Sequence, residues 1–174
     1  MSTFRIAIIG PESTGKTRLA EQLAAHFNTV AVPEIARGWI AELGKPYQQE
    51  DLVELSRLQA EAEDKLLSKK PPLLICDTNQ TVIRIWSLFK YGTVDPVITD
   101  NDACRQYELI LLTDIDIPWE QDPLRENPRQ RAELYSLYYR TLIASNRKFR
   151  IIFGRDDERL QRAVKIIRMM MESR

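Results

Sequence analysis

Eight residues near the N-terminus match a sequence pattern that binds phosphate groups. They follow G-x-x-x-x-G-K-[ST] and read Gly10-Pro11-Glu12-Ser13-Thr14-Gly15-Lys16-Thr17. A turn bounded by glycines can point successive backbone N–H groups at an anion, and the dipole of the following helix attracts the same charge. In such a loop the lysine reaches the β- and γ-phosphates, and the last hydroxyl holds Mg²⁺. We therefore expect residues 10–17 to bind ATP, with Lys16 on its phosphates and Thr17 on the metal.

A carboxylate and a guanidinium follow the second apolar run of the chain. They are Glu34 and Arg37, within Pro33-Glu34-Ile35-Ala36-Arg37. Glu34 could simply complement the dipole of a helix that begins here, with Arg37 in solvent. In a parallel sheet, however, ligands bind beyond the carboxyl ends of the strands. We therefore favour substrate-binding roles for both residues, and Glu34 is also a candidate catalytic group.

The third apolar run ends in an acid, as Leu73-Leu74-Ile75-Cys76-Asp77-Thr78-Asn79. A carboxylate in this place is typical of a Walker-B aspartate, which orders Mg²⁺ and its waters. Asp77 could instead cap the predicted helix over residues 80–89, but Thr78 or Asn79 could do so equally well. No second acid directly follows Asp77, no D-x-x-G follows this run, and no N-K-x-D or T-K-x-D follows the fourth run. A phosphotransferase is therefore favoured over an ATPase or a GTPase.

A long polar segment separates the fourth apolar run from the next predicted helix. It spans about residues 114–131, is interrupted by prolines, and carries Arg125, Arg129 and Arg131. Such a segment can close over a triphosphate, exclude water and bring arginines to the transferring group. It could also be a solvated loop ahead of a helix. Because the same chain has a phosphate loop, we expect a lid in which Arg125 is catalytic and Arg129 and Arg131 bind ATP.

Strand-like and helix-like segments alternate along the chain, and this alternation must position these side chains. Strands are expected at five short apolar runs, which are Phe4–Ile9, Thr29–Val32, Leu73–Cys76, Leu109–Leu112 and Arg150–Phe153. The longer segments between and after them have helical spacing. Strands that are apolar throughout, separated by helices, form a parallel sheet covered on both faces. The predicted fold is a three-layer α/β domain that includes residues 1–174.

Composition narrows the class of protein further. The 25 basic and 25 acidic side chains cancel, so no surface for nucleic acid or an anionic membrane is expected. The two cysteines, Cys76 and Cys104, cannot form a disulfide framework. Residues 1–3 lead directly into the first strand and leave no room for a signal peptide, and no apolar run approaches membrane-spanning length. We expect a cytoplasmic protein, with no indication of its oligomeric state.

Four elements, taken in order, resemble the NadR-type ribosylnicotinamide kinase domain, a family of P-loop kinases. They are the phosphate loop, Glu34 with Arg37, Asp77-Thr78-Asn79, and Trp119-Glu120-Gln121-Asp122-Pro123-Leu124-Arg125. The resemblance covers nearly the whole chain. It implies a five-stranded parallel sheet of order 2-3-1-4-5 with helices on both faces. It also implies transfer of the γ-phosphoryl group of ATP to the 5′-hydroxyl of nicotinamide riboside, which gives nicotinamide mononucleotide for NAD salvage.

The chain departs from the family pattern at two positions. Asn79, a candidate substrate-binding residue, stands where the family often has an aspartate, and Pro123 stands where it usually has glycine. Proline cannot adopt the left-handed backbone of a glycine, so the path of the loop there is expected to differ. The sequence begins at the phosphate-loop strand. We therefore expect the fused adenylyltransferase of some relatives to be absent, and the chain not to make NAD by itself.

Nicotinamide riboside carries a pyridinium cation, which binds best to an aromatic face with carboxylates nearby. Trp119 offers this grouping because Glu120 and Asp122 flank it. Trp39 is a second candidate for stacking, whereas Trp86 is expected in the core because it lies on an amphipathic helix.

The expected mechanism is direct in-line transfer without a covalent enzyme intermediate. Either Glu34 or Asp77 accepts the proton of the 5′-hydroxyl. Three other activities remain open at this stage: a kinase for another nucleoside or nucleotide, a nucleotide-dependent regulatory ATPase, and a protein that binds ATP without turnover.

Overall fold

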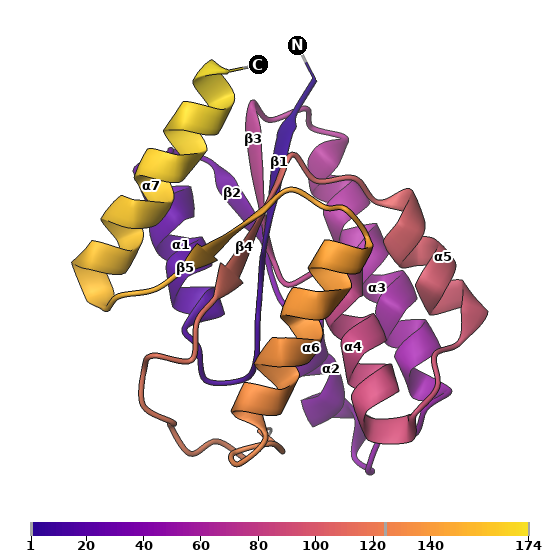
Figure 1. The fold of residues 1–174 in the computed structure, drawn as a ribbon. Coiled ribbons are helices and arrows are strands. Elements are labelled where there is room, and N and C mark those ends of the chain that lie inside the picture. The colour runs from indigo at the N-terminus through magenta and orange to yellow at the C-terminus, as the bar shows by residue number, and fades with distance from the viewer. Residues whose placement is uncertain (1, 124, 174) are drawn as a thin grey trace.

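A single five-stranded parallel sheet runs through the computed structural model (Figure 1), which describes residues 2–123 and 125–173. Its order is β2-β3-β1-β4-β5, as predicted. The strands are β1 (Phe4–Ile9), β2 (Val30–Val32), β3 (Leu73–Asp77), β4 (Leu109–Thr113) and β5 (Phe149–Ile152). Each bound lies within one residue of the predicted apolar run. Every residue of β3 and β4 is buried, which is why these runs lack the polar alternation of a half-exposed sheet.

Helices cover both faces of this sheet and form the outer two layers. The helices of the described residues are α1 (Lys16–His26), α2 (Ile35–Leu43), α3 (Asp51–Leu67), α4 (Gln80–Tyr91), α5 (Pro96–Cys104), α6 (Arg131–Ala144) and α7 (Asp156–Glu172). Figure 1 shows α1 and α7 together on one side of the sheet and α3, α4 and α6 on the other. No helix among the described residues is both long enough and apolar enough to cross a bilayer.

Successive side chains of β1 pack against the helices on opposite faces of the sheet. Ile6 and Ile8 are fully buried against the α1 and α7 side, and Ala7 and Ile9 are fully buried against the α4 and α6 side. This division follows from the period of two in a strand, which sends successive side chains to opposite faces. The central strand is therefore fixed from both faces, and with it the start of the phosphate loop at Gly10.

A third apolar cluster, away from the sheet, joins α2 to α3, α4 and α5. Leu52, Leu55, Ile83 and Ile98 form its buried centre. Helix α4 belongs to two clusters, because Ile85 packs toward the sheet while Ile83 packs outward. This double packing fixes α2 and α4 beside the carboxyl end of β3, where the predicted site residues follow the strands.

Candidate active site

The phosphate loop has the backbone geometry that its two glycines were expected to allow. Gly10 has φ 147°, and a Cβ placed there would lie 2.4 Å from the Thr113 hydroxyl oxygen. Gly15 has φ 73° and precedes the first residue of α1. Neither position accepts an L side chain without strain. The Thr14 hydroxyl bonds both the Pro11 carbonyl at 2.8 Å and the Thr113 hydroxyl at 2.7 Å, so β4 holds the loop in place.

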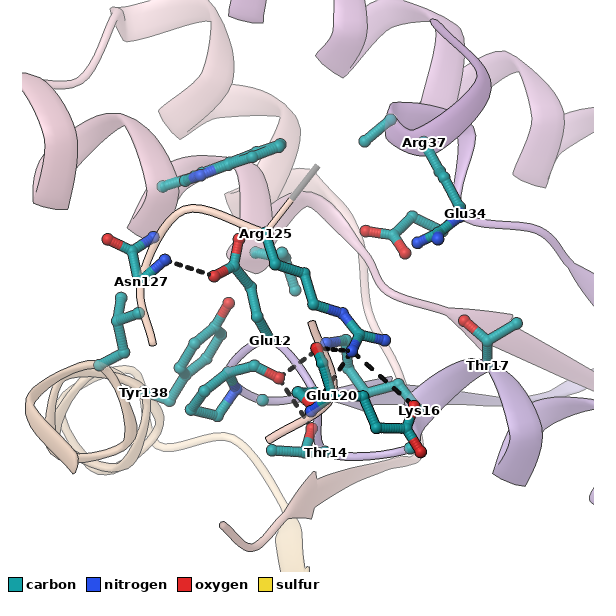
Figure 2. A pocket seen from close by; sticks show the side chains of 18 of the residues that line it. Glu12, Thr14, Lys16, Thr17, Glu34, Arg37, Glu120, Arg125, Asn127 and Tyr138 are labelled. Carbon is teal, nitrogen blue, oxygen red and sulfur yellow. Dashed lines mark hydrogen bonds and ion pairs between the residues drawn. The ribbon is translucent and has the colours of Figure 1, made fainter. Parts of the chain in front are cut away.

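A cavity of about 390 Å³ opens above this loop (Figure 2). Its volume lies within the usual range for small-molecule sites. The residues that line it are Gly10–Arg18 from the loop and α1; Glu34, Ala36, Arg37 and Ile40 at α2; Val82, Ile85 and Trp86 on α4; Ile117, Glu120, Arg125 and Asn127 from the β4–α6 segment (residues 114–130); and Leu134 and Tyr138 on α6. The structure thus brings all of the predicted phosphate-loop residues together with Glu34, Arg37 and Arg125 around one space.

Lys16 lies at the floor of the cavity, and its Nζ donates a hydrogen bond to the Pro11 carbonyl at 2.9 Å. Thr17, the next residue, also faces the cavity. Both belong to the first turn of α1, whose free N–H groups and dipole favour an anion at this end. The arrangement can therefore hold a chain of phosphates along the loop, with the ammonium group beside it.

Asp77 lies at the end of β3, 2% exposed, directly beside the phosphate-loop strand, since it pairs with Ile8 of β1. Among the described residues, neither of its buried carboxylate oxygens has a hydrogen-bond partner. Burial raises the pKa of Asp77 from 3.8 to about 6, and the charge of Glu34 acts in the same direction. The Thr17 hydroxyl and the Lys16 ammonium oppose this rise, although the hydroxyl falls short of hydrogen-bond geometry.

These two unpaired oxygens fit a divalent cation. Mg²⁺ takes oxygen ligands, and in nucleotide sites it is bound through one or two carboxylates together with phosphates and water. Thr17 provides a hydroxyl on the cavity side of Asp77. The residues therefore suit the Mg²⁺ that accompanies a nucleotide. A bound cation would offset the unfavourable free energy of the buried, charged Asp77 carboxylate.

The raised pKa of Asp77 predicts an unusual stability effect. The folded protein binds this proton more tightly than the unfolded chain does, so the contribution of Asp77 to stability falls as the pH rises from 3.8 to about 6. We expect Asp77→Asn to stabilise the ligand-free protein at pH 8 by about 1–3 kcal/mol, with a smaller gain at pH 5. Urea unfolding at the two pH values measures this difference. Equal gains, or a loss at pH 8, would contradict the assignment of a buried, unpaired charge.

Asn79, not Asp77, caps α4. Its side-chain oxygen accepts a hydrogen bond from the Thr81 backbone N–H at 3.1 Å, and the residue is 1% exposed. The alternative in which Asp77 served as the cap is therefore wrong, which leaves the Asp77 carboxylate available to a ligand. Asn79, a predicted substrate-binding residue, does not line the cavity.

Glu34 and Arg37 face the cavity from the first turn of α2, as Figure 2 shows. Glu34 occupies the N-cap position of this helix, but its side chain makes no capping hydrogen bond. Its carboxylate is therefore not needed to start the helix. Arg37 forms an ion pair with Asp122, which lies on the β4–α6 segment. This pair joins α2 to the segment predicted to act as a lid.

The β4–α6 segment lies against the phosphate loop through Ser13. The Ser13 hydroxyl accepts hydrogen bonds from the Glu120 backbone N–H at 2.9 Å and from the Arg125 guanidinium at 3.2 Å. The Arg131 guanidinium donates to the Ser13 carbonyl at 2.9 Å and to the Ile117 carbonyl at 3.0 Å. Arg125 faces the cavity, whereas Arg131 supports the loop from behind and Arg129 is exposed outside it.

Glu12 contacts the same segment rather than pointing into free space. Its carboxylate accepts hydrogen bonds from the backbone N–H groups of Glu126, at 3.2 Å, and Asn127, at 2.9 Å. Figure 2 shows the bond to Asn127 above the loop. Glu12 was predicted as an ATP-binding residue; in this structure it lines the cavity, and its carboxylate also holds the segment.

The predicted stacking residues, Trp119 and Trp39, are not among the residues that line the cavity. Trp119 is half-buried beside the guanidinium groups of Arg125 and Arg131, whose carbons lie 5.9 and 6.0 Å from its ring centroid. Trp39 packs against the third apolar cluster. Trp86 was expected in the core, and it does pack there, but it also lines the cavity.

Arg159 of α7 is a site-supporting residue that the sequence motifs do not reveal. It is 5% exposed, donates hydrogen bonds to the carbonyls of Thr14 and Gly154, and forms an ion pair with Asp116. It thus ties the phosphate loop to both neighbouring loops. One signal was available: Arg159 lies four residues before Ala163, so a charge sits on the apolar face of the predicted helix.

A phosphate loop after β1 and a buried acid at the end of the adjacent β3 define a P-loop nucleotide-binding protein. A sequence model of the family described as an AAA domain matches residues 5–159, and the chain belongs to this family. The resemblance to NadR-type proteins, predicted from the motifs, is confirmed by the relatives described next.

The chain is similar in sequence to the trifunctional NAD biosynthesis/regulator protein NadR of Escherichia coli (strain K12). The two are 27% identical over an alignment of 173 positions, which covers 95% of this chain and 42% of NadR. A crystal structure of NadR protein in complex with NR matches with a TM-score of 0.82 at 20% identity, over 97% of this chain and 51% of that one. A second, in complex with NAD and AMP-PNP, matches with a TM-score of 0.79 at 19% identity, over 97% of this chain and 50% of that one.

These structural matches establish a shared fold. The chain spans less than half the length of the E. coli protein that it matches.

Proposed function

We propose that this protein is an ATP-dependent kinase that transfers the γ-phosphoryl group to the 5′-hydroxyl of nicotinamide riboside. The observation that carries the proposal is the composition of one cavity, which combines Lys16, Glu34 and Arg125 with an apolar wall. The similarity to NadR, one structure of which contains NR and another AMP-PNP, supports this choice of substrates.

The loop end of the cavity binds the triphosphate. Backbone N–H groups of residues 10–17 and the Lys16 ammonium hold the phosphates, and Arg125 approaches from the β4–α6 segment. Thr17 and Asp77 would hold Mg²⁺, directly or through water. When bound, the cation would supply positive charge beside the phosphates. Phosphoryl transfer depends mostly on such positioning and charge neutralisation, so no covalent intermediate is needed.

Glu34 accepts the proton of the attacking hydroxyl. Of the two candidates, Glu34 lines the cavity, whereas Asp77 lies buried behind its wall. The Glu34 carboxylate also has no part in capping α2. A base must be within hydrogen-bond reach of the proton that it removes, and position therefore favours Glu34.

The acceptor occupies the end of the cavity between α2, α4 and α6. Its wall there is largely apolar and includes Trp86, Leu134 and Tyr138. The carboxylates of Glu12 and Glu34 lie on the same cavity. An aromatic face with carboxylates nearby attracts a pyridinium cation. We propose Trp86 for this role, in place of Trp39 and Trp119, and propose that Arg37 and Asp122 bind substrate indirectly, by closing the segment over it.

Acceptor profiling with MgATP tests the identity of the substrate. Nicotinamide riboside should exceed uridine and adenosine in kcat/KM by about 100-fold or more, a difference typical of a site built for one ligand. The matched control is dihydronicotinamide riboside, which has nearly the same shape but no ring charge. It should be about tenfold poorer, since cation–π attraction to a partly buried ring has about that strength. A neutral nucleoside that is turned over as well as nicotinamide riboside would overturn the proposed acceptor.

A further inference from the structure

A polar cluster outside the cavity joins the β4–α6 segment to the acceptor side of the site. The Tyr47 hydroxyl donates a hydrogen bond to the Glu126 carboxylate at 2.9 Å. The Lys90 ammonium donates to both oxygens of this carboxylate at 3.1 Å, and its nitrogen lies 3.7 Å from the centroid of the Tyr47 ring. Tyr47 and Lys90, from separate parts of the chain, therefore meet at the carboxylate of Glu126.

The backbone beside this carboxylate is bound to the phosphate loop. As described above, Glu12 accepts hydrogen bonds from the N–H groups of Glu126 and Asn127. Glu126 is thus held twice, through its side chain by Tyr47 and Lys90 and through its backbone by Glu12. Glu126 and Asn127 therefore connect the phosphate loop, through Glu12, to Tyr47 and Lys90 on the acceptor side of the site.

Glu126 and Tyr47 each lie next to residues that line the cavity. Arg125 and Asn127, on either side of Glu126, line the cavity. Tyr47 packs against Trp86, with ring centroids 5.4 Å apart, and Trp86 lines the cavity from α4. Tyr47 therefore contacts both the wall that includes Trp86 and the segment that carries Arg125.

The hydrogen bond from Tyr47 and the ion pair with Lys90 hold Glu126 with different strengths, and the weaker of the two suits a segment that opens and closes. Tyr47 is 6% exposed, and burial together with the Glu126 carboxylate raises the pKa of its hydroxyl, which keeps the hydroxyl protonated as a donor. The side chains of Lys90 and Glu126 are 33% and 40% exposed, so their ion pair is screened and weak. An exposed ion pair of this kind can break at little cost in free energy.

We propose that Glu126, Tyr47 and Lys90 are positioning residues that close the β4–α6 segment over the site and place Arg125, so that phosphate passes to the acceptor and not to water. This inference rests on the proposed kinase function. None of the three lines the cavity, so they act through Arg125 and through the exclusion of water.

The test compares Tyr47→Phe and Glu126→Gln with the wild type. Each substitution keeps the shape of the side chain and removes or weakens the bonds at the Glu126 carboxylate. Tyr139→Phe and Glu133→Gln make the same chemical changes on exposed parts of α6 and serve as matched controls. Two quantities are measured with MgATP present: hydrogen exchange at the backbone amides of residues 126 and 127, and the ratio of free phosphate to phosphorylated acceptor.

Both variants should exchange these amides about tenfold faster and raise the ratio of free phosphate to phosphorylated acceptor about tenfold, the effect expected from one lost hydrogen bond. The KM for ATP should stay within about twofold, since the contacts from phosphate-loop residues 10–17 are unchanged. The controls should match the wild type. A fall in kcat with an unchanged ratio and unchanged amide exchange would show a merely structural role and overturn the proposal.

The two proposals fail in different ways. If the wild type phosphorylates no acceptor, the kinase function is wrong. Amide exchange in the MgATP-bound protein still decides whether these residues hold the segment, since that measurement needs no acceptor.

Discussion

Lys16→Ala should reduce kcat/KM with MgATP and acceptor by about 10³-fold or more. Lys16 is the ammonium group on the floor of the cavity, at the N-terminus of α1, and it lies beside the space for the phosphates. Charge moves onto the phosphate oxygens during transfer, and a positive group held in place stabilises that charge without reorganisation. Steady-state kinetics with varied ATP measure the loss.

The control for this variant is Lys65→Ala, which removes an exposed ammonium group from α3. Its kcat/KM should remain at the wild-type value, and thermal unfolding should show that both variants are folded. An unchanged kcat/KM in Lys16→Ala would remove residues 10–17 from the phosphate site and with them the whole assignment.

Glu34→Gln should lower kcat by about 10²–10⁴-fold, the usual contribution of a positioned general base. The substitution keeps the size and hydrogen-bonding shape of the side chain but removes its ability to take a proton. Because Glu34 makes no capping hydrogen bond, α2 should remain folded. ATP affinity, measured by calorimetry, should change little, since the effect is confined to the transition state.

The kinetic constant that changes in Glu34→Gln distinguishes two roles for Glu34. A fall in kcat assigns proton transfer, whereas a loss confined to the KM for the riboside would make Glu34 a ligand of the ribose hydroxyls. Glu42→Gln, on an exposed turn of the same helix, is the matched control and should behave as the wild type.

The fold was predictable because its signals are local. Each strand is an uninterrupted apolar run, since both faces of the sheet are covered, and the phosphate loop lies between the first run and a helix. Asp77 was predictable for the same reason, as the acid that closes a buried strand. These features depend on neighbouring residues, and tertiary packing did not alter them.

The proposed acceptor wall was not predictable because distant segments build it. Trp86 and Tyr138 lie on helical stripes that look like ordinary core positions, and both also line the cavity. Periodicity marks the buried face of a helix but does not say whether that face meets another helix or an opening. Trp119, the conspicuous aromatic of the polar segment, lies beside two arginines instead.

Some polar residues also took roles that spacing does not determine. Glu12 binds two backbone N–H groups of a segment more than a hundred residues away along the chain, and Arg159 supports the loop from the last helix. Asn79 could have bound a ligand or capped α4, and it caps. Side-chain partners of this kind arise only when the chain is folded.

The central claim is that MgATP and a sugar alcohol meet in one cavity between the phosphate loop, α2 and α4. The most direct test is ³¹P NMR of the wild-type protein with MgATP, recorded with and without nicotinamide riboside. We predict slow ADP formation without the riboside and, with it, ADP and a phosphate monoester formed in equal amounts. ADP and free phosphate formed at the same rate in both samples, with no monoester, would contradict it.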